Sequence, residues 1–145
     1  PLHDDGNQPL LNGVTEIDET KPVILVVEDQ NIDLIVLAGF LWLVPKHLID
    51  AFPNKIINIH PALLPKYGGK GFYGEHVHEA VVAAKEEYSG ITIHYVNEHY
   101  DSGDIIFQAQ VALEEGETPD SLAAKIHTLE YKHYPEVIEK LTIDN

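Results

Sequence analysis

Residues 33–65, DLIVLAGFLWLVPKHLIDAFPNKIINIHPALLP, hold two short apolar runs separated by a segment that contains a proline. The first run, residues 33–38, is followed by Gly39, and the second, residues 56–60, leads into a proline-rich loop. Short runs of branched apolar residues are typical of strands buried on both faces of a sheet. Proline at the first helical position favours a short helix over residues 45–52. A strand, a helix and a second strand in this order predict an α/β fold.

The rest of the chain continues this alternation. Apolar runs or alternating patterns predict strands at residues 21–29, 90–96 and 105–111, and helical periods or capping residues predict helices at 75–87 and from 118 to the C-terminal end. Residues 1–20 show neither period and are expected to form an irregular arm. We therefore expect one domain, residues 1–145, with a doubly wound, mostly parallel sheet flanked by helices. Ligands of such folds bind beyond the carboxyl ends of the strands.

Composition limits the partners that this chain can have. It contains 24 Asp and Glu residues against nine Lys and no Arg, and its formal net charge is −15. Such a charge repels nucleic acid and anionic membrane surfaces, so neither is an expected partner. The absence of Cys removes thiolate chemistry, and the longest apolar run, residues 34–44, is too short to span a membrane. The cytoplasm is the expected location.

Two polar clusters occur where predicted strands end. Asn58 and His60 are two residues apart in a predicted strand, so their side chains point to the same side. His94 and the segment 97–104, which includes Asp101, form the second cluster. A carboxylate beside an imidazole favours the charged form of the ring and makes the histidine an acid near neutral pH. From these residues alone, a structural histidine and a catalytic one both remain open.

A metal site is the weaker explanation of the nine histidines in this chain. His76 and His78 are two residues apart on a predicted helix and do not face each other. A zinc site needs at least a third ligand, for which the candidates are scattered. We therefore expect no bound metal.

Three local patterns, taken together, indicate a family. They are Asn58-Ile-His60-Pro-Ala-Leu-Leu-Pro-Lys-Tyr67, Gly74-Glu-His-Val-His78-Glu-Ala and Gly90-Ile-Thr-Ile-His94-Tyr-Val-Asn-Glu-His-Tyr-Asp101-Ser-Gly-Asp-Ile-Ile. In this order they resemble the phosphoribosylglycinamide formyltransferase family, which is folate-dependent and belongs to purine biosynthesis, from about Asn31 to the last helix. The resemblance implies transfer of a formyl group from the co-substrate 10-formyltetrahydrofolate to the amine of glycinamide ribonucleotide, without a metal.

The resemblance assigns the catalytic roles to Asn58, His60 and Asp101. Attack on a formyl carbon builds an oxyanion, which fixed donors stabilise, and the Asn58 amide and a protonated His60 are such donors. Asp101 would stabilise the imidazolium and help move a proton from the attacking amine to the departing folate nitrogen.

The resemblance also implies binding residues. The folate contacts are Phe40, Leu41, Trp42, Leu43, Val44, Val96, Asn97, Glu98, His99, Tyr100 and Asp101. The ribonucleotide contacts are Gly39, Leu41, Asn58, Pro61 and Glu130, and His94 has a supporting role. Without the resemblance, the segment around Phe40 is equally well explained as apolar core and Glu130 as a solvated helix acid.

The chain differs from the family at its start. The family begins with a strand and a Gly/Ser/Asn-rich loop whose N–H groups hold the substrate phosphate at a helix N-terminus, and nothing in residues 1–30 resembles that loop. A formyltransferase-like sheet without its first βαβ segment would leave a surface bare, so self-association is expected. The alternative function is a catalytically idle fragment or folate-binding module of the same superfamily. In either case we expect tighter binding of a folate analogue than of glycinamide ribonucleotide.

Overall fold

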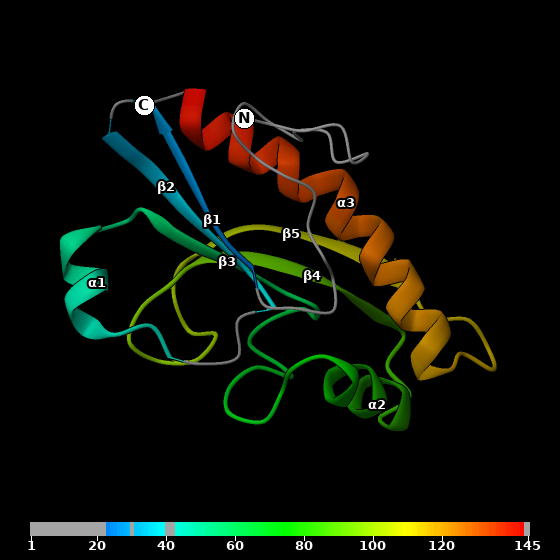
Figure 1. Ribbon diagram of the computed structural model, residues 1–145. Coiled ribbons are helices and arrows are strands. Elements are labelled where there is room, and N and C mark those ends of the chain that lie inside the picture. The colour runs from blue at the N-terminus through cyan, green and yellow to red at the C-terminus, as the bar shows by residue number, and fades with distance from the viewer. Residues whose placement is uncertain (1–22, 30, 40–42, 144–145) are drawn as a thin grey trace, which may run out of the picture.

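The computed structural model describes residues 23–29, 31–39 and 43–143 (Figure 1). The predicted irregular arm, residues 1–20, lies outside them. In chain order the elements are β1 (Val23–Asp29), β2 (Asn31–Ala38), α1 (Lys46–Ala51), β3 (Ile56–His60), α2 (Glu75–Ala83), β4 (Tyr88–Tyr95), β5 (Ile105–Ala112) and α3 (Pro119–Ile143). The strands and helices that the sequence patterns predict are all present, with some displaced ends.

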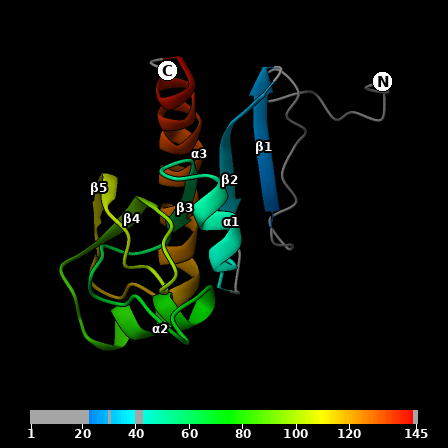
Figure 2. The same cartoon turned by 90° about the vertical axis from the view of Figure 1, so that its left-hand side faces the viewer.

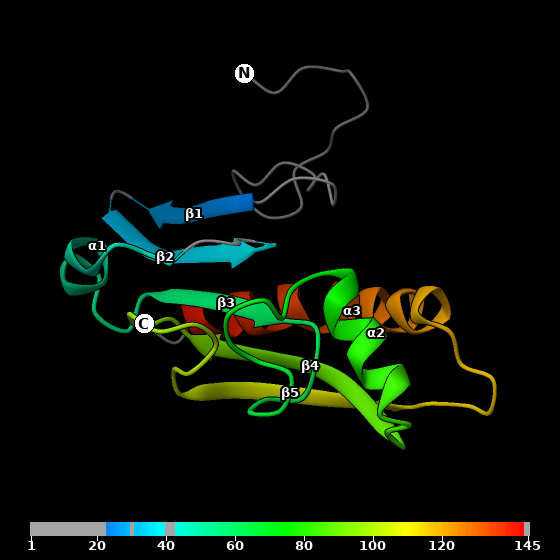
Figure 3. The same ribbon diagram turned by 90° about the horizontal axis from the view of Figure 1, so that it is seen from below.

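The strands form one mixed sheet in the order β1-β2-β3-β4-β5 (Figure 3). Strands β2 and β3 are parallel, whereas the pairs β1–β2, β3–β4 and β4–β5 are antiparallel. The predicted α/β class is confirmed, but the expected doubly wound, mostly parallel arrangement is corrected to a mixed sheet. Parallel neighbours need a crossover of a dozen or more residues, and the connections from β1 to β2 and from β4 to β5 are too short for one.

Helix α2 ends earlier than its apolar period suggests. The period extends to residue 87, but the helix stops at Ala83. Lys85 then adopts a φ of 55°, in the left-handed region that interrupts a helix of L-residues. The chain enters β4 at Tyr88, so this strand begins before the predicted position, Gly90.

The core lies between the sheet and α3, which packs against β2, β4, β5 and α2 (Figure 2). Leu122 and Ile126 of α3 are fully buried and belong to one apolar cluster with Ile57, Ile91 and Ile93 of the central strands. Burial of each such side chain stabilises the fold by about 1.5–3 kcal/mol. Strands β3 and β4, which carry the polar residues singled out above, are therefore rigidly supported from the α3 side.

Helix α3 is capped at its start and bonded to the sheet in its second half. The Thr118 hydroxyl, just before the helix, accepts the Ser121 N–H at 3.1 Å, and Pro119 at the first position has no N–H to satisfy. Further along, the Tyr134 hydroxyl donates to the Leu37 carbonyl at 2.7 Å and so holds the C-terminal end of β2. Among the helices of the described residues, none has the length and apolar character needed to cross a membrane.

Candidate active site

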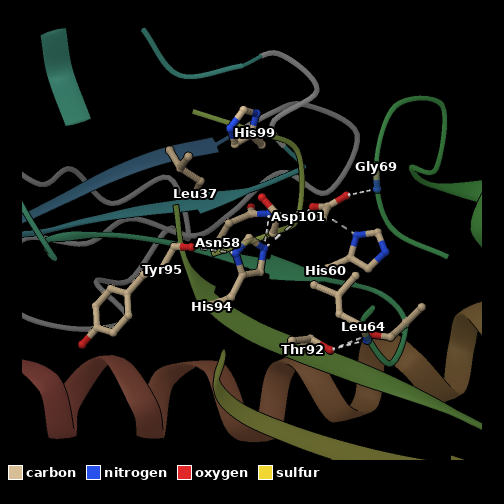
Figure 4. Close-up of polar contacts among 12 residues, drawn as sticks. Leu37, Asn58, His60, Leu64, Gly69, Thr92, His94, Tyr95, His99 and Asp101 are labelled. Atoms are coloured by element: carbon tan, nitrogen blue, oxygen red, sulfur yellow. Dashed lines mark hydrogen bonds and ion pairs between the residues drawn. The ribbon is translucent and has the colours of Figure 1, made fainter. Parts of the chain in front are cut away.

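Side chains of the neighbouring strands β3 and β4 meet within the sheet. Asn58 and His60 point to the same side of β3 because they are two residues apart. The strand register places His94 of β4 opposite Asn58, and Asn58 Nδ2 lies 3.4 Å from His94 Nε2. Both histidines are buried, with 3% of His60 and 2% of His94 exposed. The structure thus brings the amide and imidazole groups together (Figure 4).

Asp101 joins this group from the loop between β4 and β5. Its Oδ1 atom lies 3.5 Å from His60 Nδ1 and 3.8 Å from His94 Nε2. Its Oδ2 atom accepts the Gly69 N–H at 3.0 Å. The backbone of Asp101 has a φ of 49°, a conformation that Asp tolerates better than most residues. The three residues to which the resemblance assigns catalysis, Asn58, His60 and Asp101, therefore lie in one polar cluster.

Backbone carbonyls determine which ring nitrogens carry hydrogen. His60 Nε2 lies 2.6 Å from the Tyr67 carbonyl oxygen, and His94 Nδ1 lies 2.9 Å from the Tyr95 carbonyl oxygen. A carbonyl can only accept, so these two nitrogens donate. In the neutral rings, His60 Nδ1 and His94 Nε2 are then acceptors. The Asn58 amide consequently presents its Nδ2 donor to His94.

The other end of the Asn58 amide is unpaired. Its Oδ1 atom is buried and has no hydrogen-bond partner among the described residues. An unsatisfied buried acceptor costs about 1–3 kcal/mol, and native proteins keep few of them. The amide, held on β3, therefore has an unused acceptor that an incoming ligand could satisfy.

Burial and charge act in opposite directions on His60. Burial is the largest influence and lowers the pKa of His60, whereas the Asp101 carboxylate and the Tyr67 carbonyl raise it and His94 lowers it again. The net direction is downward. The expectation that Asp101 keeps this ring protonated near neutral pH is corrected, because desolvation outweighs the carboxylate. A ring that is neutral at rest can accept a proton during a reaction.

A buried hydroxyl holds the turn that follows β3. Thr92 Oγ1 accepts the Leu64 N–H at 3.0 Å and donates to the Ala62 carbonyl at 2.8 Å. Gln108 Nε2, from β5, donates to Thr92 Oγ1 at 3.0 Å and to the Leu64 carbonyl at 3.1 Å. These bonds connect the turn to β4 and β5, and so fix the backbone that leaves β3.

The residues expected to bind folate belong to two connections. Phe40, Leu41 and Trp42 lie outside the described residues, while Leu43, with 46% exposed, and the half-buried Val44 precede α1. Val96, Asn97, Glu98, His99 and Tyr100 lead from β4 to Asp101 and are half-buried or exposed. Asn97 Oδ1 accepts the His99 N–H at 2.9 Å and the Ser102 hydroxyl at 3.1 Å. Asn97 therefore orders this loop.

The residues expected to bind the ribonucleotide come from three elements. Gly39 is exposed directly after β2, with a φ of 67°, and Pro61 is half-buried directly after β3. Glu130 is half-buried on α3, about one turn before Tyr134. Because the Tyr134 hydroxyl binds the Leu37 carbonyl, this turn of α3 lies at the C-terminal end of β2. Glu130 is thus about one helical turn from the tyrosine that contacts Leu37, the residue two positions before Gly39.

The segment Tyr67–Gly69 is a part of the site that the polar residue patterns do not indicate. It contributes backbone atoms, the Tyr67 carbonyl to His60 and the Gly69 N–H to Asp101. The sequence signal that could have found it is the glycine-rich stretch 67–74, since glycine permits close approach of the backbone to another group. No group of three or more His, Asp or Glu that could hold a metal occurs in the part of the chain that the structure describes.

Comparison with known proteins points to one family. A family model described as formyl transferase matches residues 15–138. The chain is 49% identical over 113 residues to the chloroplastic phosphoribosylglycinamide formyltransferase of Arabidopsis thaliana, and the aligned region covers 78% of this chain and 39% of that protein. It is 42% identical over 111 residues to phosphoribosylglycinamide formyltransferase of Bacillus subtilis (strain 168), and the aligned region covers 77% of this chain and 54% of that protein. The chain spans about half, or less, of the length of these relatives.

Solved structures of similar fold include a phosphoribosylglycinamide formyltransferase and a formyltetrahydrofolate deformylase. Phosphoribosylglycinamide formyltransferase from Bacillus halodurans has a TM-score of 0.69 and 41% identity, covering 76% of this chain and 54% of that one. A formyltetrahydrofolate deformylase from Pseudomonas syringae pv. tomato has a TM-score of 0.59 and 26% identity, covering 68% of this chain and 31% of that one. The similarity to the first structure therefore extends over about three quarters of the chain.

Proposed function

The chain belongs to the formyl transferase family, and on that premise we propose that it transfers a formyl group from 10-formyltetrahydrofolate to the primary amine of glycinamide ribonucleotide. The Arabidopsis thaliana and Bacillus subtilis relatives are named phosphoribosylglycinamide formyltransferases, which supports this choice of acceptor. The proposal rests above all on one observation, the convergence of Asn58, His60 and Asp101 within a single polar cluster.

The proposed reaction forms one carbon–nitrogen bond and breaks another. The amine nitrogen attacks the formyl carbon, and the carbonyl electron pair moves to oxygen to give a tetrahedral oxyanion. When that intermediate collapses, the bond between the carbon and the folate nitrogen breaks. The amine nitrogen loses a proton and the folate nitrogen gains one. Such a site needs a fixed donor for the oxyanion and a group that carries the proton.

Asn58 is the fixed donor in this proposal. Its Nδ2 group contacts His94 Nε2 at 3.4 Å, which orients the amide and leaves the second hydrogen on Nδ2 for the formyl oxygen. The buried Oδ1 atom, unpaired among the described residues, would accept a hydrogen bond from an N–H of the attacking amine. One rigid side chain would then hold both reacting groups, which lowers the cost of bringing them together.

His60 and Asp101 are the proton carriers. Burial lowers the pKa of His60, so the resting ring is ready to accept a proton at Nδ1, the atom that faces Asp101 Oδ1 at 3.5 Å. The protonated ring stabilises the oxyanion by its charge, and Asp101 balances that charge. Collapse of the intermediate returns the proton to the folate nitrogen. Every step uses the chain's own side chains.

Only part of the expected binding segments lies among the described residues. Leu37 of β2 pairs with Asn58 of β3 and Ala38 pairs with Ile59, so the chain reaches Gly39 two residues after the position opposite the Asn58 amide. We place the ribonucleotide against Gly39, Leu41, Pro61 and Glu130, and the folate against the residues at 40–44 and 96–101. The resemblance assigns these contacts, and the register supports Gly39 among them. Self-association and a cytoplasmic location stay predictions.

Transfer and binding assays with the purified chain test the proposal. Mass spectrometry should detect formylated glycinamide ribonucleotide after incubation with 10-formyltetrahydrofolate, and Asn58→Ala should abolish most of that product. Gln110→Ala, which removes an exposed amide from β5, is the matched control and should retain it. Calorimetry with each ligand alone separates the alternative. Binding of a folate analogue without ribonucleotide binding and without product would favour the folate-binding module and overturn the proposed transfer.

A further inference from the structure

The segment Tyr67–Gly69 contacts both His60 and Asp101. It lies in the connection from β3 to α2, and the Tyr67 carbonyl accepts the His60 Nε2 hydrogen at 2.6 Å. Two residues later, the Gly69 N–H donates to Asp101 Oδ2 at 3.0 Å. His60 and Asp101 therefore each bind this segment through the polar atom that points away from the other side chain, Nε2 and Oδ2. The near atoms, His60 Nδ1 and Asp101 Oδ1, are left facing each other at 3.5 Å (Figure 4).

These contacts decide which nitrogen of His60 takes up a proton. A neutral ring with its hydrogen on Nδ1 would turn the Nε2 lone pair toward the Tyr67 carbonyl oxygen at 2.6 Å, which is repulsive. The neutral ring therefore carries its hydrogen on Nε2. Its Nδ1 lone pair then faces Asp101 Oδ1 at 3.5 Å. When the ring takes up a second proton, that proton therefore enters at Nδ1, between the two atoms.

Gly68 sits where a side chain has no room. A Cβ atom at this position would lie 3.2 Å from Asp101 Cβ and 2.5 Å from Leu64 Cδ2. Leu64 is itself buried, with 7% exposed, so it cannot move aside without disturbing the core. A side chain at position 68 would therefore crowd both Leu64 and Asp101, and relief of that crowding moves the segment relative to Asp101.

We propose that the segment Tyr67–Gly69 is the positioning element of the His60–Asp101 pair, and that Gly68 is the residue on which its close approach depends. In the proposed reaction the segment touches neither the formyl group nor the amine, and it acts only through the side chains of His60 and Asp101. The consequence for transfer rests on the proposed function, whereas the tautomer of His60 does not.

Nitrogen NMR of the histidine-labelled chain tests the arrangement without any substrate. At a pH where His60 is neutral, its two ring nitrogens should show the pattern of hydrogen on Nε2, with the resonances assigned by their loss in His60→Gln. In Gly68→Ala, the Nε2 preference should fall as the Tyr67 carbonyl withdraws. Lys70→Ala is the control, because it changes an exposed side chain in the same loop without replacing a glycine of positive φ. It should leave the tautomer unchanged.

Kinetics supply the second readout. If the chain is active, Gly68→Ala should lower kcat on the order of tenfold to a hundredfold with little change in KM, since misplaced groups slow the chemical step. Wild-type His60 with its hydrogen on Nδ1 would overturn the proposal by itself, even if Gly68→Ala fails to fold. A folded Gly68→Ala variant with an unchanged tautomer would overturn the role of Gly68. Absence of transfer by the wild type would instead count against the proposed function and leave the tautomer result standing.

Discussion

Acid should destabilise this protein through His78, a buried histidine outside the polar cluster of Asn58, His60 and Asp101. His78 lies on α2, which packs against α3, and 4% of it is exposed. Its Nδ1 atom is buried without a partner among the described residues. Burial lowers the pKa of His78 to about 4, and the nearby rings of His127 on α3 and His60 on β3 act in the same direction.

The magnitude follows from the difference between folded and unfolded chains. An unfolded histidine takes up a proton near pH 6.5, whereas folded His78 resists protonation until about pH 4. Between these values the unfolded state binds more protons, so the free energy of unfolding falls as the pH falls. At about 1.4 kcal/mol per pH unit, the loss from pH 7 to pH 4 is about 3 kcal/mol. The stability is fully present above pH 6.5 and is lost toward pH 4.

Urea unfolding of the wild type and of His78→Leu at several pH values between 7 and 4 measures this loss. Leucine fills a similar volume, does not titrate and leaves no unpaired nitrogen between α2 and α3. Other groups lose stability equally in both proteins, so the difference between the two curves isolates His78. We expect the free energy of unfolding of His78→Leu, relative to that of the wild type, to rise by about 3 kcal/mol as the pH falls from 7 to 4. Parallel curves across that range would refute the reasoning.

Three further substitutions have distinct expected outcomes. Asn58→Ala should lower kcat about a hundredfold to a thousandfold without moving the pH profile, because an amide donor does not titrate; a shifted profile would contradict this role. Asp101→Asn should lower the pKa of His60 further, because it removes the carboxylate that raises it; the loss of activity on acidification, where protonation removes the neutral ring that accepts the proton, should therefore move to lower pH than in the wild type, and an unchanged pH–rate profile would remove Asp101 from the mechanism. Tyr134→Phe should lower the free energy of unfolding by about 1–3 kcal/mol, measured by urea titration, because the Leu37 carbonyl loses a buried donor; unchanged stability would show that water replaces it.

Strands and helices were accessible from the sequence because each expresses its own pattern. The apolar run at residues 33–38 and the run at 56–60 mark β2 and β3, and Pro119 after Thr118 marks the start of α3. Strand direction is different in kind. A buried strand has a similar composition whichever way its neighbour runs, so composition alone does not give the direction. The connections from β1 to β2 and from β4 to β5 are too short for parallel pairs, but residues 61–87 separate β3 from β4, and only the pairing shows that these two strands are antiparallel. The early end of α2 likewise depends on the left-handed backbone of Lys85, a residue type that predicts no such turn.

Sequence alone determined that Asn58 and His60 share one side of a strand, since side chains in strands alternate with a period of two. It also marked Asp101 as a partner through the motif that follows His94. The tertiary structure decided how they interact. It placed Asp101 between two histidines, and it buried His60 deeply enough that desolvation outweighs the carboxylate. The Tyr67 carbonyl and the Gly69 N–H complete the site. The glycine-rich stretch 67–74 marks where the backbone can approach another group closely, but backbone atoms are the same in every residue, so only the fold shows that they face His60 and Asp101.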